Sequence, residues 1–166
     1  MRGQAGQEPV IGGKAAELLK SRYALIVAIV DDEGAPFATR GWGLTLLPDH
    51  PEQVRLVLSA ADGRLLQDPS RRRAVAITAG DPRTLHSVQF KGQAGVAEPA
   101  TDEDQVEVGR YCDSFFGVVA EVDGTDRRLL ERLVPDSFVA CTVEIEELYD
   151  QTPGPGAGAA LPGGRH

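Results

Sequence analysis

A continuous apolar run covers residues 24–30 and reads ALIVAIV. A run of this kind, rich in β-branched side chains, is typical of a strand that is buried on both faces. The next residues, DDEG at 31–34, have turn chemistry, and Gly34 supplies the positive φ that a tight hairpin loop needs. Pro36 can open the return strand, because the first residue of a strand needs no ladder N–H. We therefore expect a β-hairpin within residues 23–47.

The return strand of this hairpin should begin at Phe37. Within it, Gly41 and Gly43 flank Trp42, the only tryptophan of the chain. A glycine inside a strand often marks a bulge, or the close approach of another backbone or of a ligand. The triplet of residues 41–43 is therefore a place where a ligand could contact the sheet.

Polar and apolar residues alternate with the period of a strand in later segments as well. Within residues 84–97, Ser87 and Lys91 lie on one face, while Val88 and Phe90 lie on the other. The strands predicted after the hairpin are residues 53–59, 74–78, 84–97 and 138–148.

Residues 101–116 carry the strongest helix signal. Thr101 is a good N-cap, and the acidic residues behind it favour the positive end of the helix dipole. The helix predicted at residues 60–68 begins directly after Ser59, so its first backbone N–H groups could hold an anion at the end of the preceding strand. Two further short helices are predicted at residues 14–22 and 126–134.

The order of these elements predicts the fold class. We expect a mainly β (α+β) fold, an antiparallel β-barrel of six or more strands, closed or partly open, with peripheral helices. With 166 residues, the chain lies in the usual range of a single domain. The domain should cover residues 14–149, preceded by a flexible N-terminal arm of residues 1–13.

Residues 150–166 form a Pro/Gly-rich C-terminal tail, which should lack regular structure from Pro153 onward. Two interpretations are open for it. The tail is either a flexible end or a polyproline-like segment that folds over a neighbouring subunit. Deleting residues 150–166 without effect on dimerisation or ligand affinity would exclude the second interpretation.

The composition argues against several classes of function. A net charge of −8, with acidic residues spread along the chain, is unfavourable for binding nucleic acid. The basic run at residues 71–73 has no aromatic residues interleaved for base stacking. The apolar run of residues 24–30 is far shorter than the roughly 20 residues of a membrane span, and the N-terminus has no signal-peptide core. We expect a cytoplasmic protein that binds neither nucleic acid nor membranes.

Metal and nucleophile chemistry are also not indicated. Cys112 and Cys141 are too few for a zinc site or a disulfide framework, and we expect both to be reduced. No His, Cys or acidic residues have metal-ligand spacing, and no nucleophile is paired with a base. We therefore assign neither a metal site nor a catalytic residue.

Several strings then occur in a characteristic order: VAIVDDEGAPFATR, VRLVLSAADGRLLQDP, HSVQFKGQAGVAE, and the helix and closing strand that follow. Together they resemble the pyridoxamine 5'-phosphate oxidase-like split-barrel family over residues 14–149. The resemblance implies a homodimer that binds FMN at the subunit interface. The terminal Trp and Arg elements that recognise pyridoxamine phosphate in the true oxidases are absent, so vitamin B6 chemistry is not expected.

The resemblance also implies positions for a flavin phosphate site. Ser59 matches the Ser or Thr at the end of the third strand, and Arg64 falls close to the basic residue of the helix start that follows. Thr39 stands where many members have arginine, and Arg40 comes one residue later, on the opposite face unless the strand is bulged. Ser87 falls where the family often has a polar contact to the flavin. The full implied cofactor-binding set is Thr39, Arg40, Trp42, Ser59, Arg64, Ser87 and Lys91.

Considered without the family, these residues have other interpretations. Arg40 and Arg64 could hold a phosphate bidentately or be surface arginines. Trp42 could stack on a planar ligand or belong to the core or an interface. Lys91 could be a solvated turn charge, and His86 is better explained as a buried or interface residue than as a metal or haem ligand.

Two functions follow as hypotheses. The first is an FMN-binding oxidoreductase that acts on a small organic substrate at a homodimer interface, with the flavin supplying the chemistry. The second is a non-enzymatic or haem-handling split-barrel dimer that has lost the phosphate clamp. Leu44 replaces a lysine of the true oxidases, and the acidic Asp62 stands where a basic or hydroxyl residue is usual, which would allow the second. Under the first, Ser59→Ala and Arg64→Ala should weaken FMN binding.

Overall fold

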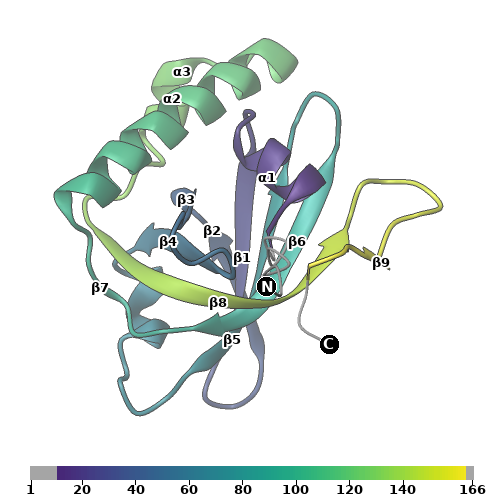
Figure 1. Cartoon of the computed structure of the whole chain (residues 1–166). Helices are drawn as coiled ribbons and strands as arrows, with labels where there is room; N and C mark the ends of the chain where they lie inside the picture. The colour runs from purple at the N-terminus through teal and green to yellow at the C-terminus, as the bar shows by residue number, and fades with distance from the viewer. Residues whose placement is uncertain (1–10, 164–166) are drawn as a thin grey trace, which may run out of the picture.

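The computed structural model describes residues 11–163, whose arrangement is shown in Figure 1. Residues 1–10 of the predicted N-terminal arm and residues 164–166 of the tail lie outside the described residues. The helical elements are α1 (Gly13–Leu19), the 3-10 helix η1 (Asp62–Leu66), α2 (Asp102–Asp123) and α3 (Arg127–Glu131). The strands are β1 (Ala24–Val30), β2 (Pro36–Arg40), β3 (Gly43–Leu46), β4 (Gln53–Ser59), β5 (Arg73–Gly80), β6 (Ser87–Ala94), β7 (Glu98–Pro99), β8 (Phe138–Asp150) and β9 (Ala159–Ala160).

The strands of the described chain form one antiparallel sheet in the order β2-β1-β5-β6-β8-β4-β3. The short strands β7 and β9 both pair with β8. The sheet curls into a half-barrel, and α2 lies across one end of it (Figure 1). The predicted fold class, a mainly β split barrel with peripheral helices, is confirmed.

The predicted hairpin is present, but its return strand divides between two partners. β2 pairs with β1 from Pro36 to Arg40, whereas β3 pairs with β4. Gly41 lies at the division, where an added Cβ would come within 2.9 Å of the Cβ of Leu25. The absence of a side chain at this position therefore lets the chain pass closely against β1 as it moves to its second partner.

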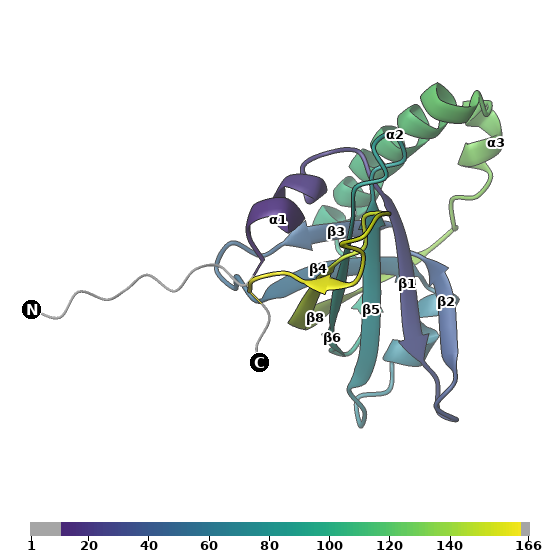
Figure 2. The same cartoon turned by 90° about the vertical axis from the view of Figure 1, so that its right-hand side faces the viewer.

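β1 is buried on one face only, which contradicts the expectation from its apolar run. Val27 and Ile29 are completely buried inside the half-barrel. On the other face, Ile26 is 51% exposed and Val30 is 39% exposed. Figure 2 looks onto this outer side, where no helix of the described chain covers β1, β2 and β5. An apolar sheet face is thus uncovered in the single chain.

The inner face of the sheet and the buried sides of α1 and α2 enclose one hydrophobic core. Cys141 is buried on β8 and Cys112 is half-buried on α2, and both are free thiols, as expected. Burial raises the pKa of Cys141 to about 12, so its sulfur stays protonated and packs as a small apolar group. No helix within residues 11–163 is both long and apolar enough to cross a membrane.

The long helix α2 begins where the sequence predicts and extends further. The Thr101 hydroxyl accepts from the Asp104 N–H at 3.2 Å, and the Asp104 carboxylate accepts from the Thr101 N–H at 2.9 Å, which is a capping box. The helix does not stop near residue 116. It continues to Asp123, where Gly124 ends it with a φ of 73°.

The tail returns to its own sheet. Residues 151–158 contain no helix or strand, in agreement with the expectation, but residues 159–160 add β9. Tyr149 pairs with Ala160 in this short ladder, and the N–H of Leu161 donates to the carbonyl of Leu148 at 2.8 Å. The described part of the tail therefore pairs with β8 of its own chain.

Candidate functional site

Two hydroxyl groups from the predicted phosphate site meet at a carboxylate. Thr39 on β2 and Ser59 at the end of β4 both donate to Oδ2 of Asp62, each at 2.7 Å. The backbone N–H of Asp62 donates in turn to the Ser59 hydroxyl at 3.1 Å. The curl of the sheet brings the two strands to this point, although they are not neighbours in it. The hydroxyls therefore already have an anionic acceptor from the chain itself.

The segment that carries Asp62 is packed tightly in place. The helix predicted at residues 60–68 is only a five-residue 3-10 helix, and its first N–H already donates to Ser59. An added Cβ at Gly63 would lie 2.2 Å from Cγ2 of Val139 on β8. Since Gly63 packs directly against β8, η1 holds the Asp62 carboxylate at the end of β4.

A cleft of about 240 Å³ lies beside this carboxylate, and we call it the Asp62 cleft. Arg64 lines it and is exposed. Three carboxylates and one guanidinium surround the cleft, which is the reverse of the charge balance that a phosphate ester requires. Its lining residues are Asp31, Glu33, Phe37, Ala61, Asp62, Arg64 and Leu65.

Arg40 and Trp42 do not line the Asp62 cleft. The β1–β2 register is regular, so Arg40 lies on the opposite face of β2 from Thr39. The Arg40 guanidinium carbon lies 5.1 Å from the ring centroid of Phe115 and 6.0 Å from that of Trp42. Trp42 is buried, and its ring packs edge-on against Phe138. Arg40 thus makes cation–π contacts, while Trp42 is a core residue without an exposed ring face.

Ser87 and Lys91 lie on the outer face of β6. The Ser87 hydroxyl donates to the Leu85 carbonyl at 3.0 Å, and its N–H donates to the Thr152 hydroxyl at 3.1 Å. The ammonium of Lys91 lies 4.6 Å from the ring centroid of Tyr149. Within the described chain, the seven predicted cofactor-binding residues therefore divide among the surroundings of Asp62, the aromatic contacts of Arg40 and the outer sheet face.

His86, which the sequence suggests is a buried or interface residue, is half-buried in the β5–β6 hairpin. Its Nε2 atom is buried and has no hydrogen-bond partner among the described residues. The preceding residue, Leu85, has a φ of 61°, which is unusual for a side chain of its kind. Within residues 11–163, no group of three His, Cys, Asp or Glu residues could hold a metal ion.

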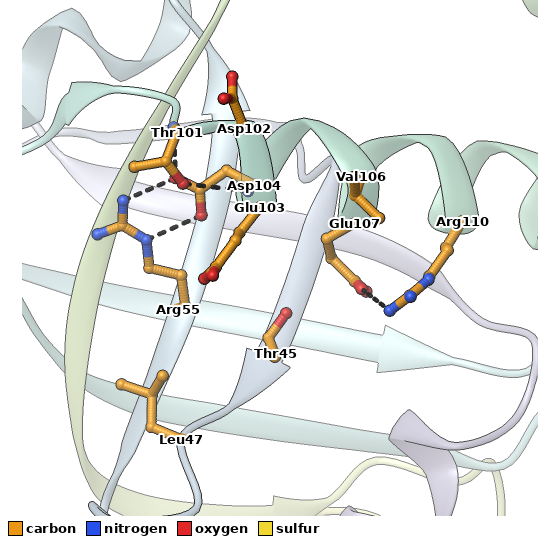
Figure 3. Close-up of a pocket in the computed structure, with 10 residues that line it drawn as sticks. All are labelled: Thr45, Leu47, Arg55, Thr101, Asp102, Glu103, Asp104, Val106, Glu107 and Arg110. Atoms are coloured by element: carbon orange, nitrogen blue, oxygen red, sulfur yellow. Dashed lines mark hydrogen bonds and ion pairs between the residues drawn. The ribbon is translucent and has the colours of Figure 1, made fainter.

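A larger groove of about 650 Å³ separates the first turns of α2 from β3 and β4 (Figure 3). The sequence pattern does not indicate this groove, because acidic residues at a helix start are sufficiently explained by the helix dipole. One wall is helix and the other is sheet, so only the docking of α2 creates it. Its lining residues are Thr45, Leu47, Arg55, Thr101, Asp102, Glu103, Asp104, Val106, Glu107 and Arg110.

The charges in this groove are mostly engaged in pairs. Arg55 donates to the Asp104 carboxylate through two hydrogen bonds, and this guanidinium holds the pKa of Asp104 below its ordinary value. Glu107 lies 3.9 Å from Arg110, yet burial raises the pKa of its carboxyl. The Arg55–Asp104 pair ties β4 to α2, so its first role is structural.

Comparison with known proteins supports the fold. An F420 reductase has a TM-score of 0.52 at 17% identity, covering 80% of this chain and 93% of that one. HutZ, a haem storage protein from Vibrio cholerae, has a TM-score of 0.45 at 18% identity, covering 84% and 94%. An FMN-binding, pyridoxamine 5'-phosphate oxidase-related protein from Nostoc punctiforme has a TM-score of 0.43 at 18% identity, covering 85% and 83%.

No protein-family model matches the sequence, and no curated protein matches it significantly. At 17% identity, the likeness to the F420 reductase establishes the fold and no activity. The chain therefore has a split-barrel fold, the fold that the sequence resemblance implies.

The residues present do not fit an FMN phosphate in the Asp62 cleft. The hydroxyls of Thr39 and Ser59 already donate to Asp62, and the only cation lining the cleft is Arg64. A dianionic phosphate would have to replace or approach the Asp62 carboxylate, which repels it. The polar groups expected to clamp a phosphate are therefore arranged around an internal anion.

Proposed function

We propose that the protein is a homodimer that binds a flavin-type cofactor, whose isoalloxazine carries a two-electron redox reaction on a small organic substrate. The cofactor supplies that chemistry, and the chain supplies binding and orientation. The split-barrel fold supports the cofactor class, since the relative with a TM-score of 0.52 is described as an F420 reductase and F420 is a flavin-type cofactor.

The uncovered outer face of the sheet is the observation that carries the dimer. Its β1, β2 and β5 positions bear only small or apolar side chains and one threonine, and no charge apart from Arg40 at the end of β2. A charge-depleted centre of this kind is typical of an interface. These positions are Ile26, Ala28, Val30, Pro36, Ala38, Arg40, Ala74, Ala76 and Thr78.

The sequence of β1 supports a second copy of the chain as the partner. Residues 24–30 have the pattern of a strand buried on both faces, and a single chain buries only one. A two-fold axis through this face would cover the second face with the same surface of a partner. Lys91 and Glu147, opposite each other on β6 and β8, would then lie at the polar margin of the interface.

The experiment is a spectroscopic titration of the purified dimer. A yellow sample, or quenching of flavin fluorescence on titration with riboflavin or FMN, is the expected result. Sedimentation velocity should give the mass of two chains. A monomer, or a protein that leaves the fluorescence of both flavins unchanged, would refute the proposal.

The second candidate is a haem-handling or non-enzymatic split-barrel dimer. The Asp62 carboxylate favours it, because a chain that does not bind a flavin phosphate has no use for a phosphate clamp. A Soret band that grows with added haem and saturates at one haem per subunit or per dimer, without any flavin binding, would select this candidate over the first.

A further inference from the structure

The Asp62 carboxylate accepts hydrogen bonds from both hydroxyl groups of the implied phosphate site. Two hydroxyls from different strands donate to the same oxygen atom, Oδ2, each at 2.7 Å. Hydrogen bonds to an ionised acceptor are short, and hydroxyl groups of Thr39 and Ser59 make such bonds with carboxylates and phosphates alike. The donors that an external anion would use are therefore engaged.

The carboxylate cannot easily move aside to release them. Its own backbone N–H donates to Ser59, which closes a local ring of hydrogen bonds. The next residue, Gly63, packs without clearance against Val139, so η1 has no room to shift toward β8. The internal anion is thus part of the fold at the end of β4.

The other residues of the Asp62 cleft also disfavour an anionic ligand. Asp31 and Glu33 lie on the same cleft, and Asp31 is held there by the N–H groups of Glu33 and Ala35, which donate to Oδ1 at 3.0 and 2.8 Å. Arg64 is the only cation among the lining residues. An anionic ligand group would therefore meet three carboxylates and one guanidinium.

We infer that Asp62 determines ligand specificity by substituting for a ligand phosphate. The Asp62 cleft accepts a flavin whose ribityl chain ends in an uncharged hydroxyl, and it rejects the 5'-phosphate of FMN. This inference rests on the proposed function for the identity of the ligand. The exclusion of phosphate by Asp62 stands on the geometry alone.

The test compares riboflavin and FMN by fluorescence quenching, with wild type and Asp62→Asn. Wild type should bind riboflavin about tenfold more tightly than FMN, because FMN brings a second anion to the carboxylate. Asp62→Asn keeps an acceptor for both hydroxyls and removes the charge, so it should shift the ratio toward FMN by about tenfold.

The control is Asp49→Asn, which makes the same change from carboxylate to amide at an exposed residue of the β3–β4 turn that does not line the cleft. It should alter the FMN-to-riboflavin ratio by less than about threefold. Wild type that prefers FMN, or a ratio that Asp62→Asn leaves unchanged, would overturn the inference. Circular dichroism of each variant verifies that the fold is retained.

A second arm uses inorganic phosphate as the probe and needs no flavin. Thermal unfolding of Asp62→Ser, which frees the two hydroxyls, should shift upward with added phosphate relative to chloride at equal ionic strength. Wild type should show no such shift. If no flavin binds any variant, the proposed function fails and this arm decides the inference alone. A phosphate-dependent shift of the unfolding temperature in wild type, or no shift in Asp62→Ser, would then refute the inference.

Discussion

Arg55 on β4 and Asp104 in the first turn of α2 form a two-bond ion pair, with Nε to Oδ1 at 3.0 Å and Nη2 to Oδ2 at 2.8 Å. The same carboxylate accepts from the N–H and the hydroxyl of Thr101, so one buried group joins the helix start to the sheet. Because α2 covers one end of the half-barrel, this pair links the local helix cap to the tertiary structure (Figure 1).

Replacing Asp104 by alanine should destabilise the protein strongly. The change removes the capping box and leaves the Arg55 guanidinium without its partner, so the free energy of unfolding should fall by about 3 kcal/mol. Urea denaturation of both proteins measures the difference. Arg110→Ala, which removes an exposed cation 3.9 Å from Glu107, should cost less than about 0.5 kcal/mol. Equal losses in the two variants would contradict the assignment.

The Arg55–Asp104 pair should also make stability depend on pH. The guanidinium lowers the pKa of Asp104 in the folded state, so the carboxylate stabilises the fold above its unfolded pKa of about 3.9. This contribution should be complete near neutral pH and should be lost as pH falls through the folded pKa. Urea denaturation at pH 7, 5, 4 and 3 should therefore show wild type and Asp104→Asn converging in acid.

Glu107 provides the comparison of opposite sign. Burial raises the pKa of this carboxyl, so the fold favours its protonated form and ionisation at neutral pH reduces stability. Glu107→Gln should accordingly be more stable than wild type at pH 7, and the difference should shrink as pH falls through the raised folded pKa and should be absent below the unfolded pKa of Glu. For the Arg55–Asp104 pair, a difference in the free energy of unfolding between wild type and Asp104→Asn that is the same at every pH would exclude the ion-pair explanation.

Gly63 should be intolerant of a side chain. Its alanine Cβ would lie 2.2 Å from the Val139 side chain, so Gly63→Ala should cost about 2 kcal/mol by overpacking. Combining it with Val139→Ala should restore at least about 1 kcal/mol relative to the sum of the single changes. Gly109→Ala is the matched control, because nothing lies within 4 Å of its added Cβ, and it should stabilise α2 by about 0.5 to 1 kcal/mol. If the losses of unfolding free energy in Gly63→Ala and Val139→Ala are additive in the double variant, the two residues are not in contact.

The dimer predicted for the outer sheet face should depend on Ile26. Ile26→Lys places a charge at the centre of the proposed interface and should give a monomer in sedimentation velocity. Leu129→Lys is the control, because Leu129 is 55% exposed on α3, comparable to the 51% of Ile26, and lies away from this face. If Ile26→Lys and Leu129→Lys have the same oligomeric state, the interface does not lie on the outer sheet face.

Much of the secondary structure could be predicted from the chain because the signals are local. The apolar run and the alternating segment gave β1 and β4 with the observed bounds, Ala24–Val30 and Gln53–Ser59. The predicted end of α2 at residue 116 is too early, because the helix continues to Asp123. The actual stop is Gly124, whose left-handed conformation ends the helix.

The candidate site was predictable only in part. Ser59 and Thr39 were selected by their positions, and Asp62 was recognised as an unusual acid. Their meeting at one oxygen depends on how far the sheet curls and on the packing of Gly63 against β8, neither of which has a local pattern. Arg40 and Trp42 were separated from the cleft by the regular register of β2 and by core packing around Phe115 and Phe138.

The sequence by itself determined where most of the strands and helices lie and that β1 is apolar on both of its faces. The periodicity of the sequence encodes these properties because each residue type has its own preference for burial. Only the tertiary structure decided that the hydroxyls of Thr39 and Ser59 donate to a carboxylate of the chain itself. That outcome depends on hydrogen-bond directions between residues from three separate elements, and those directions exist only once the sheet has closed around its core.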